Sequence, residues 1–135
     1  MKIMGLDFGK ARIGIALSDI MGFLASPYAT LYRTNENEDL EYLDKIIKEF
    51  KVETVVMGYP FEMTGNAGDT CKLVEDFAQK LKDYSNVKIV FVDERLSSVE
   101  AEEQLKLTIK DWKQRKKLLD QVSASIILQT YLDSK

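Results

Sequence analysis

The sequence predicts an α/β fold, with a five-stranded mixed sheet and helices on both faces. Three strand-like segments come first, and two further apolar segments then alternate with helix-like segments. That order is typical of an antiparallel meander followed by right-handed crossover units, which place the later strands beyond the first strand. We therefore expect the strand order 3-2-1-4-5, with strand 2 antiparallel, in a single domain over residues 1–135.

The first three strands follow from apolar stretches that end at turn residues. Residues 2–8 are apolar and end at Gly9, and residues 12–18 alternate apolar side chains with small or polar ones. Since only three residues separate these segments, we expect an antiparallel hairpin. A weaker strand is expected within residues 22–32, where Pro27 favours an edge position.

Helices and buried strands are expected to alternate through the middle of the chain. Apolar residues at helical spacing predict helices over residues 38–51 and about 73–84. Continuous apolar runs at residues 54–57 and 87–92 are typical of parallel strands that are buried on both faces.

Two more helices are expected towards the C-terminus. Ser97 with Glu100 forms a capping-box pattern, which predicts the start of a helix. Helical spacing then predicts a last helix over residues 116–132.

The composition excludes several kinds of site. The chain has no histidine and one cysteine, Cys71. A Ser-His-Asp relay, a zinc site that needs imidazole and an internal disulfide are therefore impossible. If the protein is an enzyme, carboxylates are the expected catalytic groups, and a hard metal ion is a candidate cofactor for them. Because no 18-residue apolar run and no cleavable leader pattern occurs, we expect a cytoplasmic location and no membrane partner.

Basic residues gather in one segment of this acidic protein. The net charge is −3, yet residues 106–117 carry six basic residues and one acid, which leaves −8 on the rest. A local anion-binding surface is compatible with that asymmetry, and Trp112 within it is able to stack on a base. A solvated helix face with Trp112 as a core anchor is the alternative. On the first interpretation, nucleic acid contacts Lys110, Lys113, Arg115, Lys116 and Lys117.

Acidic residues stand at three informative places. Asp7 lies within the first, apolar strand, where a lone buried carboxylate is costly. Asp93 and Glu94 follow the last strand, at the edge where open α/β sheets bind ligands, and alternation lets at most one face the site. Asp120 shares a helix face with apolar residues and is expected to point inward at the start of that helix. A turn aspartate, a solvated strand end and the helix dipole are the respective structural alternatives.

Acids that face one crevice repel each other unless a cation neutralises them. Oxygen ligands suit Mg²⁺ or Mn²⁺. Such clusters commonly hold two metal ions about 4 Å apart, where one activates a water and the other stabilises the leaving oxygen of a phosphodiester. This chemistry requires no histidine.

Four motifs, taken in chain order, resemble the signatures of the YqgF/RuvX family. They are residues 7–19 (Asp-Phe-Gly-Lys-Ala-Arg-Ile-Gly-Ile-Ala-Leu-Ser-Asp), Gly58-Tyr59-Pro60 with Gly65, residues 93–98 (Asp-Glu-Arg-Leu-Ser-Ser), and Asp120-Gln121-Val122-Ser123-Ala124 with the residues up to Leu132. The family comprises ribonuclease H-like proteins that are described as pre-16S rRNA nucleases and as Holliday junction resolvases. The match covers nearly the whole chain.

The resemblance implies a ribonuclease H-like fold in which Asp7, Glu94 and Asp120 are the catalytic, metal-binding residues. The chain departs from the usual pattern at Tyr59, Thr64 and Ser123, where Leu, Asp and Ala are more common, and none of these is one of the three acids. Arg12 and Arg95 lie beside the motifs, where each is able either to hold a phosphate or to pair with an acid.

The preferred function is a nuclease that processes the 5′ end of pre-16S rRNA in ribosome biogenesis, with a structured RNA precursor as substrate. Resolution of branched DNA is the alternative, and its two symmetric cuts predict a homodimer where RNA processing allows a monomer. Two further alternatives are an actin-like phosphotransferase fragment, which would need a second Asp-x-Gly hairpin, and a catalytically silent nucleic-acid-binding module.

Overall fold

The computed structural model describes residues 2–59, 68–93, 103 and 112–134, with the side chains of 68, 69 and 112–117 left out. The strands are β1 (Lys2–Phe8), β2 (Arg12–Ser18), β3 (Ala25–Tyr32), β4 (Val52–Tyr59) and β5 (Lys88–Asp93). The helices are α1 (Glu36–Glu49), α2 (Gly68–Ser85) and α4 (Trp112–Asp133).

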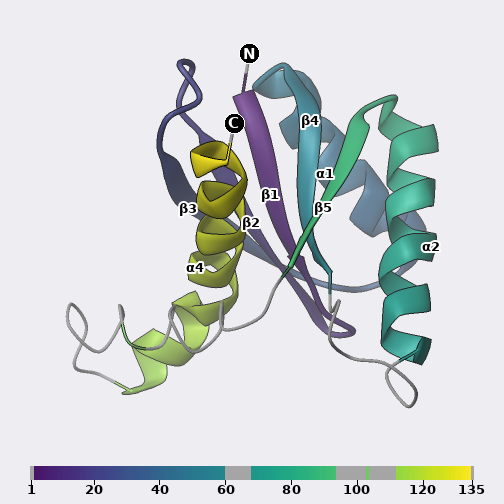
Figure 1. The fold of residues 1–135 in the computed structure, drawn as a ribbon. Coiled ribbons are helices and arrows are strands. Elements are labelled where there is room, and N and C mark those ends of the chain that lie inside the picture. The colour runs from purple at the N-terminus through teal and green to yellow at the C-terminus, as the bar shows by residue number, and fades with distance from the viewer. Residues whose placement is uncertain (1, 60–67, 94–102, 104–111, 135) are drawn as a thin grey trace.

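The strands form one five-stranded sheet in the order β3-β2-β1-β4-β5, as the sequence predicts. β2 is antiparallel to both β1 and β3, and β4 is parallel to both β1 and β5. Helices α1 and α2 cover one face and α4 covers the other (Figure 1). The expected fold class is therefore confirmed, and β3 with Pro27 lies at the edge.

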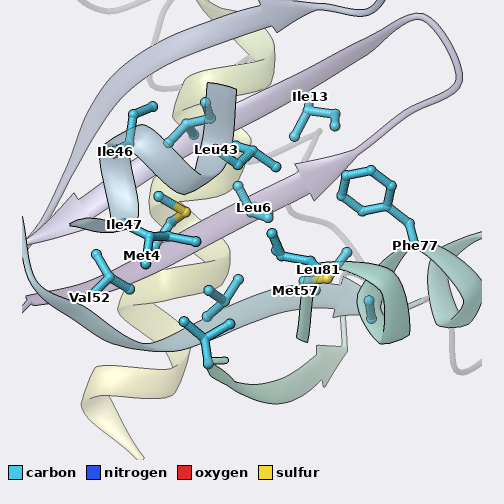
Figure 2. Close-up of a cluster of buried hydrophobic side chains, with 14 of the residues drawn as sticks. Met4, Leu6, Ile13, Leu43, Ile46, Ile47, Val52, Met57, Phe77 and Leu81 are labelled. Carbon is cyan, nitrogen blue, oxygen red and sulfur yellow. The ribbon is translucent and has the colours of Figure 1, made fainter. Parts of the chain in front are cut away.

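Strand alternation divides the apolar side chains between two cores. The larger core packs β1, β2 and β4 against α1 and α2, and Figure 2 shows its central side chains. The smaller core packs the other face of the sheet against α4, through Ala16, Val56, Ala124, Ile127, Leu128 and Leu132. β4 lies between β1 and β5 and contributes to both cores, as its continuous apolar run predicts. The same prediction is wrong for residues 88–92, because β5 is an edge strand and is only partly buried.

Helix α1 begins and ends about two residues before the predicted bounds. Asn35 is its N-cap, and the Asn35 side chain accepts a hydrogen bond from the Glu38 N–H at 2.9 Å. The helix ends where Lys51 adopts a left-handed backbone with φ of 54°. The Asn35 cap therefore determines where α1 begins, and the spacing of apolar residues alone did not predict that position.

Helix α4 begins at Trp112, one turn before the predicted start. Asp120 consequently lies more than two turns into the helix, beyond the reach of the positive helix end. The helix dipole therefore does not explain this acid. The predicted capping pair Ser97 and Glu100 lies outside the described residues.

Arg33 links the β1–β2 turn to the helical layer. Its Nε lies 2.9 Å from the Asp39 carboxylate, which is only 1% exposed, and its terminal nitrogen donates to the Gly9 carbonyl at 3.3 Å. The guanidinium also lies over the rings of Phe8 and Phe77, at 4.8 and 5.3 Å from their centroids. Arg33 thus fixes the turn that follows Asp7.

Replacing Arg33 with Lys is expected to lower the unfolding free energy by about 1–2 kcal/mol, because an ammonium keeps the charge but loses the planar, branched contact. Urea denaturation followed by circular dichroism measures the change. Lys45→Arg is the control, because Lys45 forms an exposed pair with Glu41. Equal stability of the Arg33→Lys protein and the wild type would show that the guanidinium contacts do not hold the turn.

Candidate active site

The β1–β2 hairpin places Asp7 on the face that α4 covers. Asp7 pairs with Gly14 across the hairpin. Its neighbours Leu6 and Phe8 belong to the core under α1 and α2. Because side chains alternate along a strand, Asp7 faces the opposite side, towards α4.

Gly14 brings the backbone of α4 against this point of the sheet. A Cβ added at Gly14 would collide with the carbonyl oxygen of Asp120, so only glycine permits the approach. Gly5 repeats the arrangement further along α4, where an added Cβ would lie 2.8 Å from the Ala124 carbonyl oxygen. Asp7 and Asp120 are therefore both immediate neighbours of Gly14.

Sequence reasoning did not identify Gly14 as a site residue, although a signal was present. A short hairpin turn fixes which residues lie opposite each other, and this register sets Gly14 opposite Asp7. A glycine beside an inward-facing acid indicates that another backbone approaches there.

Arg12 forms an ion pair with Asp120, the residue whose backbone lies against Gly14. Arg12 Nε lies 2.8 Å from Asp120 Oδ2, and the two side chains are 44% and 22% exposed. Of the two roles expected for Arg12, the structure shows the pairing with an acid.

Asp93, the last residue of β5, lies on the face of the sheet opposite α4. Val90 and Val92 pack towards α4, so alternation places Asp93 on the other face of the sheet. Asp93 pairs in register with Tyr59 of β4, which lies between β5 and β1. Glu94, like Arg95, lies outside the described residues.

Only some of the predicted basic residues are among the described residues. The backbone of Lys113, Arg115, Lys116 and Lys117 belongs to the first turns of α4, directly before Asp120. Lys110 lies outside the described residues.

Tyr59, a departure from the family pattern, lies on the α2 face of the sheet. Its hydroxyl donates a hydrogen bond to the Glu75 carboxylate at 2.5 Å, and this bond is the main cause that raises the pKa of Tyr59. The Tyr59 ring lies 5.1 Å from the ring of Phe91. These contacts hold the Tyr59 side chain against α2, on the face of the sheet opposite Asp7.

The donor chemistry at Gly14 suits a hard divalent cation. Asp7 and Asp120 supply only oxygen atoms, which Mg²⁺ and Mn²⁺ prefer. Ser123, one turn beyond Asp120, is 1% exposed, and its hydroxyl has no hydrogen-bond partner among the described residues. Within the described residues no three acids gather as a metal cluster, and Glu94, the expected third ligand, is not among them.

Comparisons with known proteins show the family to which the chain belongs. The RuvX family model, described as "Holliday junction resolvase", matches residues 1–134. The chain belongs to the RuvX family. A relative from Carboxydothermus hydrogenoformans, named "Putative pre-16S rRNA nuclease", is 45% identical over 100% of this chain and 98% of its own length. A relative of the same name from Syntrophomonas wolfei is 44% identical over 98% of this chain and 94% of its own length.

Solved structures share the fold. The chain is similar to RuvC of Thermus thermophilus in complex with a Holliday junction substrate, with a TM-score of 0.66 and 13% identity over 99% of this chain and 95% of that one. It is also similar to the fowlpox virus resolvase in its junction complex, with a TM-score of 0.60 and 13% identity over 99% and 98% of the two chains. The expected ribonuclease H-like fold is therefore confirmed. None of the described helices of this RuvX protein is long and apolar enough to cross a bilayer.

Proposed function

We propose that this protein is a metal-dependent nuclease that processes the 5′ end of pre-16S rRNA. The observation that carries the proposal is the convergence of Asp7 and Asp120 on Gly14, where β1 and α4 meet. Family membership over residues 1–134 supports hydrolysis of a nucleic acid at this place.

The proposed ligands of Mg²⁺ or Mn²⁺ are Asp7, Glu94 and Asp120. A bound divalent ion supplies Lewis-acid activation of water and stabilisation of the leaving oxygen. Asp7 is held by a paired strand and Asp120 by a helix docked on the sheet, so both carboxylates are preorganised on rigid elements. Asp93 faces away from α4 by alternation along β5, so the ligand role at this end of the sheet is assigned to Glu94, which the family resemblance implies.

The proposed substrate is a structured ribosomal RNA precursor. Two relatives that share more than 40% identity with nearly the whole chain carry the name of a pre-16S rRNA nuclease. Phosphate contacts are assigned to Arg12 and Arg95 and to the basic residues that lead into α4, Lys110, Lys113, Arg115, Lys116 and Lys117. Residues 1–135 act as a single domain in the cytoplasm, where bacterial ribosomal RNA matures.

Cleavage of branched DNA is the second candidate. The description of the matching family model favours it, and two symmetric cuts would require a homodimer with two sites. A monomer that cleaves RNA would argue against it.

The experiment offers the purified protein a 5′-extended pre-16S transcript, the same transcript without the extension, and a four-way DNA junction. We expect Mg²⁺- or Mn²⁺-dependent cleavage of the extended transcript only, with light scattering reporting the oligomeric state. Cleavage of the junction alone by a dimer would replace the first candidate with the second. Failure to cut any of the three would contradict both.

The two neighbouring acids after β5 provide a matched pair of variants. Glu94→Gln is expected to lower the cleavage rate by about a hundredfold or more, because a proposed ligand loses its charge. Asp93→Asn is expected to change it by less than about tenfold, since Asp93 lies on the other face. Single-turnover cleavage of the extended transcript measures both rates, and a larger loss in Asp93→Asn would exchange the two assignments.

A further inference from the structure

Arg12 binds the same carboxylate that the proposed metal ion requires. Arg12 Nε lies 2.8 Å from Asp120 Oδ2, at the distance of a charge-assisted hydrogen bond. Two cations that share one carboxylate repel each other at a few ångströms. Arg12 and a divalent ion therefore compete for Asp120.

The two partners differ in how firmly they are held. The Asp120 backbone lies against Gly14, so α4 docking fixes the base of the carboxylate. Arg12 is the first residue of β2, and its side chain is 44% exposed. Because its long side chain reaches water, the guanidinium is able to leave Asp120 without becoming a buried, unpaired charge. Of the two partners, Arg12 is therefore the one that is able to leave the ion pair.

The guanidinium has an obvious second partner in a nucleic acid. An arginine carries five N–H donors in a planar fork that matches the oxygens of a phosphate. The turn before β2, closed by the hydrogen bond from Gly9 N–H to the Arg12 carbonyl at 2.9 Å, keeps Arg12 close to Asp7 and Asp120. A phosphate at the metal site lies within reach of the same side chain.

We propose that Arg12 is an exchangeable counter-ion, which neutralises Asp120 until a divalent ion binds and then contacts a phosphate of the nucleic acid. This assignment rests on the proposed function. It predicts that loss of Arg12 has opposite effects on two affinities, which a merely structural ion pair would not produce.

The test compares Arg12→Gln with the wild type in two titrations. With Mn²⁺ alone, followed by electron paramagnetic resonance, we expect about threefold tighter binding, on the scale of a partly exposed ion pair. With the extended transcript in Ca²⁺, followed by fluorescence anisotropy, we expect about fivefold weaker binding from the lost phosphate contact. Unchanged or weaker Mn²⁺ binding, or unchanged RNA binding, would overturn the proposal.

Three further variants make the result specific. Lys45→Gln removes one positive charge from α1 on the opposite face and is expected to change neither affinity by more than about twofold. Arg12→Lys keeps the charge, so its Mn²⁺ affinity is expected to stay near that of the wild type. Asp120→Asn is expected to lose Mn²⁺ binding. If Asp120→Asn binds Mn²⁺ like the wild type, the proposed metal site itself is wrong, whereas failure of Arg12→Gln alone refutes only the role of Arg12.

Discussion

Replacing Asp7 with Asn is expected to reduce cleavage of the extended transcript by about a thousandfold, which corresponds to about 4 kcal/mol of activation free energy. The amide keeps the shape of the side chain but loses the charge that holds a divalent ion. Single-turnover cleavage in Mn²⁺ measures the loss.

Asp7→Asn is also expected to fold as well as the wild type. The side chain is half-buried, and the amide of asparagine has nearly the same size and shape as the carboxylate, so the packing around it is kept. Thermal unfolding measured without metal is the control, and Glu41→Gln on the exposed side of α1 controls for the loss of an acid. Undiminished cleavage by a folded Asp7→Asn protein would show that the site lies elsewhere.

Replacing Gly14 with Ala is expected to lower the unfolding free energy by about 3 kcal/mol, which is at the upper end of the usual cost of inserting an extra carbon into a packed core. The added Cβ meets the Asp120 carbonyl oxygen, which belongs to a helix backbone and cannot rotate away as a flexible side chain does. The helix must therefore shift as a body, and Asp120 moves away from Asp7.

Urea denaturation measures the change in stability, and Mn²⁺ binding is expected to weaken in the fraction that remains folded. Ala11→Ser, in the exposed turn of the same hairpin, is expected to change stability by less than about 0.5 kcal/mol. Wild-type stability of Gly14→Ala would show that α4 does not depend on this close approach.

The sequence predicts the strand order because its signals are local. Alternation, the hairpin at Gly9 and continuous apolar runs each restrict the choices, and the rules for crossover connections leave one order. Asp7 and Asp120 were identifiable because each is an acid on an otherwise apolar face. Of the two acids at the end of β5, alternation along the strand allows at most one to face the site, and only the family resemblance selected Glu94.

Long-range contacts were not accessible in the same way. The Arg12–Asp120 pair joins residues more than a hundred positions apart, and the sequence left phosphate and acid equally open as partners of Arg12. Arg33 gave no periodic signal, because its role depends on Phe8, Phe77 and Asp39 meeting in space. The start of α4 was misplaced because a basic segment lacks the apolar spacing that marks a helix.

A crystal soaked in Mn²⁺ tests the metal site most directly. We expect an anomalous difference peak in contact with the carboxylates of Asp7 and Asp120, within about 2.5 Å of an oxygen of each, and no such peak in Asp120→Asn. A peak bound elsewhere, in a protein that cleaves the extended transcript, would contradict the assignment of this site.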